Sequence, residues 1–143
     1  IRANIKSVDV DERLKEEMTT EATFNCDIEN ATCMITSMST YADMSTNSLF
    51  SGTPKGVSAE MEVRGQTYKD KVEAESLGTR WHRWHMKIPE LDIEVDEEKE
   101  VKIKTTWKEK IFKNAKTSFI NTYVTYVVVC KRGLKYSNGE CVE

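Results

Sequence analysis

The sequence contains few of the residues that usually build a catalytic or cofactor site. It has only two histidines and six glycines, and it lacks the G-x-S-x-G, H-E-x-x-H and phosphate-cradling glycine motifs. Its carboxylates fall on alternating, solvent-facing positions, whereas a glycosidase acid needs an enclosed pocket to raise its pKa. We therefore expect that the protein is not an enzyme and that it uses no cofactor.

Long apolar runs and an excess of positive charge are also missing. No stretch approaches the roughly 20 apolar residues that a membrane-spanning helix needs, and the chain shows no signal peptide. With 21 Lys and Arg against 24 Asp and Glu, the net charge is −3. A nucleic-acid binder would carry a concentrated positive surface. We expect no nucleic-acid partner and no membrane insertion of this segment, whereas the charge permits a basic protein partner.

The cysteines indicate an oxidising compartment. There are four, Cys26, Cys33, Cys130 and Cys141, and no pair has the C-x-x-C spacing of a zinc or redox site. Between the first two lies Asn30-Ala-Thr32, an N-glycosylation sequon. Paired cysteines beside a sequon favour a secreted, extracellular protein that is disulfide-bonded and glycosylated at Asn30.

The most β-prone stretch runs from Phe119 to Cys130. Branched and aromatic side chains occupy nearly every position, as expected of a pleated, half-buried strand. Alternate residues form two faces, which are mixed at the start and apolar on both sides at the end. We expect a central strand whose apolar end lies deep in a core.

Shorter alternating stretches occur along the rest of the chain, most clearly over Val57–Arg64. The run from Thr40 to Gly56 is rich in Ser, Thr, Asn, Gly and Pro and predicts a long loop. The total of about eight or nine strands separated by turn signals is typical of a two-sheet β-sandwich. We predict an all-β protein with a single domain over residues 1–143.

Two histidines, His82 and His85, lie in the run Arg80–Ile88. In a strand their spacing places them on opposite faces, so they cannot jointly bind one ion. No neighbouring Asp or Cys completes a ligand set, and we expect no metal site. We interpret Trp81 and Trp84 as packing on either side of a sheet.

An acidic alternating stretch precedes a basic one. Leu91, Ile93 and Val95 are predicted to point inward, while the carboxylates between them form what we call the acidic ridge: Glu90, Asp92, Glu94 and Asp96. The following strand carries Lys102 and Lys104. If the two strands pair, their charges neutralise each other; otherwise the ridge offers an exposed surface to a cationic partner. For partner binding we single out the ridge, with Trp81 as an aromatic anchor.

The four cysteines, the strand count and the run Tyr123-Val-Thr-Tyr126-Val-Val-Val-Cys130 together resemble a ZP-N domain. From Asp9–Met18 through Thr79–His85 to the end, the chain is similar to the tandem repeats of the vitelline envelope receptors for lysin. The resemblance implies an immunoglobulin-like sandwich that serves as a structural glycoprotein repeat of the egg coat. It also implies non-enzymatic binding of the cationic sperm lysin in species-selective gamete recognition, beside sister repeats in filaments.

The cysteine spacing departs from that family, in which the first cysteine usually pairs with the fourth and the second with the third. Here the cysteines form two close couples along the chain. Cys26–Cys33 and Cys130–Cys141 would be local staples, whereas Cys26–Cys130 would bridge the sheets. The sequence does not choose among the three connectivities; we favour a bridge from Cys26 or Cys33 to the strand that ends at Cys130. The alternative function is a generic extracellular immunoglobulin-like adhesion module that binds another surface protein.

Overall fold

A computed structural model of the chain describes residues 1–13, 17–46, 57–72, 75–76, 81–108 and 115–143. Side chains are described for residues 1–8, 18–43, 58–70, 72, 83–107 and 119–143. Every regular element in this part of the chain is a β-strand. The strands are β1 (Arg2–Arg13), β2 (Glu17–Phe24), β3 (Ala31–Thr46), β4 (Val57–Val63), β5 (Gln66–Val72), β6 (Glu75–Ser76), β7 (Trp81–Ile88), β8 (Ile93–Val95), β9 (Val101–Lys108), β10 (Ala115–Cys130), β11 (Lys135–Ser137) and β12 (Glu140–Val142).

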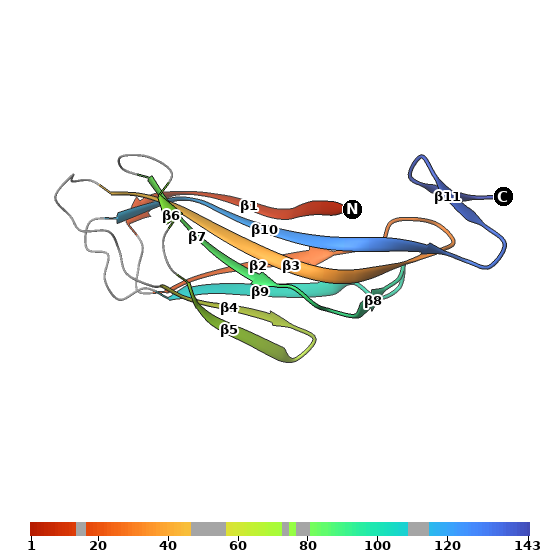
Figure 1. Cartoon of the computed structure of the whole chain (residues 1–143), viewed down its shortest axis with the longest axis horizontal. Coiled ribbons are helices and arrows are strands. Elements are labelled where there is room, and N and C mark those ends of the chain that lie inside the picture. The colour runs from red at the N-terminus through yellow and green to blue at the C-terminus, as the bar shows by residue number, and fades with distance from the viewer. Residues whose placement is uncertain (14–16, 47–56, 73–74, 77–80, 109–114) are drawn as a thin grey trace.

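The strands form two packed antiparallel sheets (Figure 1). In the larger sheet the order is β1-β10-β3-β7-β6, and β8 continues beside β3 beyond the end of β7. In the smaller sheet the order is β2-β9-β4-β5, and β11 and β12 form a separate hairpin at the end of the chain. The prediction of an all-β, immunoglobulin-like two-sheet sandwich is confirmed. Among the described residues no helix has the length and apolarity needed to cross a membrane.

The core lies between the sheets and is filled by inward-facing residues of both. Trp84 of the larger sheet and Trp107 of the smaller one are 0% and 1% exposed, so each layer contributes a large buried aromatic. Alternation along the strands explains the pattern, because successive side chains point to opposite faces. Ile93 and Val95 are buried as predicted, and Leu91 packs against the core from its margin.

The predicted loop from Thr40 to Gly56 is wrong at its beginning, because β3 continues to Thr46. Residues 47–56 lie outside the described part of the chain. The inward positions of this extension are Thr40 and Ala42, both fully buried, and the Thr40 hydroxyl donates to the Asn121 carbonyl oxygen (3.2 Å). Small or hydrogen-bonded side chains fill these core positions, and a search for hydrophobic periodicity misses them.

Strand β10 is central, as predicted, and pairs with β1 on one side and β3 on the other. The prediction that its apolar end is deeply buried is wrong. The buried part is the middle, around Ile120 and Val124, whereas Val127 and Val129 are 49% and 53% exposed. These two valines lie on the outer face of the larger sheet, where no described segment covers them. β-Branching alone does not show whether a second layer is present.

The disulfides are Cys26–Cys33 and Cys130–Cys141, so the expected bridge from Cys26 or Cys33 to β10 is wrong. The turn at residues 29–30 brings Cys26 and Cys33 to a Cα separation of 5.6 Å. Opposite Cys130 the strand register places Ala31 rather than a cysteine. The Asn138-Gly139 turn, with positive φ at both residues, instead returns Cys141 to the end of β10. Two disulfides are typical of proteins exported from the reducing cytosol.

Candidate functional site

The acidic ridge lies along the margin of the larger sheet. Glu94 is in β8 opposite Met34 of β3, and Glu90 and Asp92 are in the connection that leads to β8. All three side chains are exposed. The Leu91 N–H donates to the Thr36 carbonyl oxygen (2.8 Å), which holds the connection against β3. The carboxylates therefore project from a fixed support.

The ridge is not neutralised by the basic strand that follows it. β8 belongs to the larger sheet and β9 to the smaller one, so the two strands do not pair. In the smaller sheet, Lys104 lies opposite Glu21 on one side and Glu62 on the other. Within the described residues, none of the carboxylates of Glu90, Asp92 and Glu94 forms an ion pair, so all three are available to a partner.

Asp96 has a different role from the other three ridge residues. Its side chain is half-buried. The carboxylate accepts the backbone N–H groups of Glu98 (2.9 Å) and Lys99 (2.8 Å), in the manner of an Asx turn. Asp96 is thus engaged in closing the turn between β8 and β9, and the exposed part of the ridge consists of Glu90, Asp92 and Glu94.

Arg64 joins the two sheets beside the ridge. Its guanidinium donates to the backbone carbonyl oxygen of Glu94 (2.6 Å) from the turn between β4 and β5, where Arg64 has φ 48° and Gly65 has φ 78°. An open recess of about 290 Å³ lies between this turn and residues 90–93. Because Arg64 binds a carbonyl and not a carboxylate, it fixes the position of β8, and among the described residues it forms no direct ion pair with the ridge.

The predicted aromatic anchor cannot be placed on a surface. The backbone of Trp81 pairs with Ser45 at the start of β7, but its side chain lies outside the described residues, as does that of His82. His85 is on the outer face and stacks flat on Tyr41, with ring centroids 4.6 Å apart and 6° between the planes. Among the described residues no group of three or more His, Cys, Asp and Glu could hold a metal ion.

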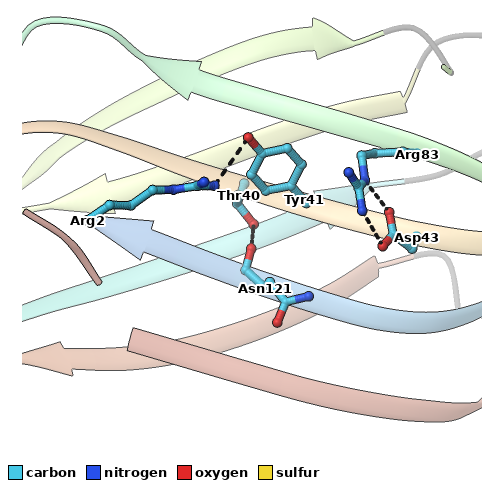
Figure 2. A network of polar contacts seen from close by, with 6 residues as sticks. All are labelled: Arg2, Thr40, Tyr41, Asp43, Arg83 and Asn121. Atoms are coloured by element: carbon cyan, nitrogen blue, oxygen red, sulfur yellow. Dashed lines mark hydrogen bonds and ion pairs between the residues drawn. The ribbon is translucent and has the colours of Figure 1, made fainter. Parts of the chain in front are cut away.

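A network of arginine and aromatic side chains, which sequence patterns did not predict, crosses four strands of the larger sheet. Figure 2 shows four of its members, Arg2, Tyr41, Asp43 and Arg83. The Arg2 guanidinium lies 4.1 Å from the centroid of the Tyr123 ring and also donates to the Tyr41 hydroxyl (3.5 Å). Arg83 lies 5.2 Å from the Tyr41 centroid. We call this group the arginine–aromatic ladder; its members are Arg2, Tyr41, Asp43, Arg83, His85 and Tyr123.

The members of the ladder interact with one another, which distinguishes it from the acidic ridge. Tyr41 and Tyr123 meet edge to face with centroids 5.7 Å apart, and Arg83 pairs with Asp43. Such contacts stabilise the outer face through cation–π and edge-to-face attraction. Only cross-strand register could have revealed the ladder, because its residues are far apart in the sequence.

Asn30, the residue of the glycosylation sequon, lies in the turn before β3. It has φ 62°, and its carbonyl oxygen accepts the Lys131 N–H (2.8 Å). Its half-buried side chain borders an open recess of about 410 Å³ between residues 27–30 and 139–141.

Comparison with known proteins does not assign the chain to a family. No protein-family model matches the sequence, and no curated protein does. Among solved structures, the chain is similar to one described as dimeric latent PorU from Porphyromonas gingivalis, with 10% identity and a TM-score of 0.38. That similarity covers 96% of this chain and 13% of the other.

Proposed function

We propose that this chain is an extracellular recognition module without enzymatic activity, a repeat of the egg vitelline envelope that binds the cationic sperm lysin. The observation that carries the proposal is the exposed part of the acidic ridge, in which Glu90, Asp92 and Glu94 project from a supported segment without ion pairs among the described residues. The partner's identity comes from the resemblance of the sequence to lysin-receptor repeats. In this proposal sister repeats pack beside the domain in filaments, and Asn30 carries a glycan.

The ridge would act by attracting and orienting its partner. Fixed carboxylates on one margin of a sheet attract a positively charged protein, and this attraction raises the association rate more than it slows dissociation. Because the carboxylates are exposed, their attraction is screened by salt over about 10 Å at 0.1 M ionic strength. Binding would loosen contacts between egg-coat filaments without cutting a bond.

The test is binding of purified sperm lysin to the domain, measured by calorimetry at several salt concentrations. Reversing Asp92→Lys and Glu94→Lys should weaken the complex by about tenfold or more and flatten its salt dependence. The matched control is Glu140→Lys with Glu143→Lys, which makes the same change in net charge on the C-terminal hairpin. This control should bind almost as the unmodified domain does.

Two results would count against the proposal. Absence of any complex with the unmodified domain at low salt would remove lysin as the partner. Equal weakening by the ridge variant and the hairpin variant would show that only net charge matters and that the ridge is not the binding site.

A further inference from the structure

Three apolar side chains adjoin one another on the outer face of the larger sheet. Val127 lies opposite Met34 in the register of β10 and β3, and Val129 lies opposite Thr32. The two valines are 49% and 53% exposed, and Met34 is half-buried. We call Val127, Val129 and Met34 the valine strip. Isolated exposed apolar residues are ordinary, whereas a contiguous group on a sheet face is typical of an interaction site.

The valine strip is continuous with the acidic ridge. Met34 lies opposite Val127 on one side and Glu94 on the other, so the three residues form a single row across β10, β3 and β8. Two inter-strand spacings separate the ends of this row, a distance of about 10 Å. The adjacent row towards the middle of the sheet consists of Thr125 and Ser37, whose short side chains allow close approach of a partner.

We infer that the row Val127–Met34–Glu94 is the centre of a docking surface for an amphipathic helix of the cationic partner. A helix with its side chains is about 10–12 Å across, which matches the width of the row. Its apolar residues would cover the valine strip. Its Lys or Arg side chains, with their aliphatic stems over Met34, would reach Glu94. This inference rests on the proposed function and adds the chemistry of the contacting segment.

Charge complementarity selects this occupant over an apolar one. The strip ends at exposed carboxylates that have no ion pair among the described residues, and a purely apolar partner would leave them partly desolvated and unpaired. The two halves of the surface would contribute differently to binding. The strip supplies buried apolar contact that is insensitive to salt, whereas the ridge supplies attraction and orientation that salt weakens.

The experiment compares three variants of the 143-residue domain, with purified sperm lysin as the probe. The strip variant is Val127→Thr with Val129→Thr, which keeps side-chain shape and β-branching while adding hydroxyl groups. The ridge variant is Asp92→Lys with Glu94→Lys. The control is Val142→Thr, which changes an exposed valine of the C-terminal hairpin. Calorimetry at two temperatures and several salt concentrations gives the affinity, its salt dependence and the heat-capacity change.

The strip variant should bind about tenfold more weakly with an unchanged salt dependence and a less negative heat-capacity change, because less apolar surface is buried. The ridge variant should instead lose salt dependence, and Val142→Thr should bind as the unmodified domain does. The strip variant's own unfolding midpoint shows that it is folded.

The other outcomes overturn the inference in distinguishable ways. If the strip variant binds lysin as tightly as the unmodified domain, the inference fails and the proposed function stands. If the unmodified domain does not bind lysin, both fail. If sedimentation shows self-association of the unmodified domain that the strip variant abolishes, a second copy of the chain covers the strip instead.

Discussion

Arg83 and Asp43 form a two-pronged ion pair across β7 and β3, with Nε–Oδ1 at 2.8 Å and Nη2–Oδ2 at 3.1 Å. The pair lies on the outer face, and Tyr41 packs under the guanidinium. The Asp43 side chain is only 13% exposed, so its charge depends on Arg83 for compensation. Two parallel hydrogen bonds also hold the planar groups in one orientation.

The first prediction concerns the strength of this pair. Asp43→Asn should lower the free energy of unfolding by about 1 kcal/mol, because it removes a charge-assisted, partly buried contact. The comparison is Lys69→Gln, which breaks the pair with Glu60 by changing the partner whose side chain is 71% exposed. That change should cost less than about 0.5 kcal/mol. Urea unfolding of both variants measures the difference, and equal losses would contradict the prediction.

The two disulfides should differ in their contribution to stability. Cys26 and Cys33 are each 1% exposed, so replacing both with Ala loses core packing as well as the cross-link. We expect a loss of about 3 kcal/mol or more. Replacing Cys130 and Cys141 with Ser should cost less, because that bond fastens an exposed hairpin outside the core.

Thermal unfolding of the two variants compares these effects. Peptide mapping without reduction should recover the pairs Cys26–Cys33 and Cys130–Cys141. Recovery of a peptide that links Cys26 or Cys33 to Cys130 would refute the connectivity.

Stability should fall at high pH through Tyr126. Burial, and then the neighbouring Tyr136, raise the pKa of Tyr126 above 10.0. The folded protein therefore holds this proton more tightly than the unfolded chain. The resulting stability is fully present below pH 10 and is lost as pH rises through the folded-state pKa.

Urea unfolding at about pH 8 and about pH 11 tests this expectation, by the same linkage relation. Tyr126→Phe keeps the ring that lies 5.0 Å from Phe24 but cannot ionise. The variant should lose less stability than the unmodified protein between the two pH values. An identical loss would assign the pH dependence to other groups.

The turn between β4 and β5 should favour glycine at position 65 because of its positive φ angle, and not because a side chain there would collide with a neighbour. Gly65 has φ 78°, and a Cβ built there would meet no heavy atom within 4 Å. Gly65→Ala should therefore cost about 1 kcal/mol from the left-handed conformation and nothing from collision. Gly65→Asn is the control and should cost less, because Asn tolerates this region. Equal stabilities of the two variants would contradict the argument.

Alternation predicted which residues face the core but not which strands become neighbours. Ile93 and Val95 are buried and Glu94 is exposed, as their positions in the sequence indicate. That β8 pairs with β3, and β9 with β2 and β4, depends on packing across the whole chain. For this reason the sequence did not show whether the lysines of β9 neutralise the carboxylates of the acidic ridge.

Alternation of apolar and polar residues also does not predict which apolar residues stay exposed or which cysteines pair. Val127 has the same neighbours in the sequence that a buried valine would have, and only the lack of a covering layer exposes it. The pairing of Cys130 depends on the turn at Asn138-Gly139, which returns Cys141 to the end of β10, and the spacing of the cysteines alone does not show this. The ladder likewise depends on register between distant strands, which composition does not encode.

The pairing of β1 with β10 determines how the domain responds to pulling. Ile1 exchanges two hydrogen bonds with Tyr126, at 2.9 and 2.8 Å, near the end of β10. Because the strands are antiparallel, tension applied at Ile1 and Cys130 acts across the ladder and opens its bonds one after another, like a zipper. Shear loading would instead strain many bonds at once. Under such tension β1 would therefore peel away at low force while the tryptophan-filled interior stayed closed.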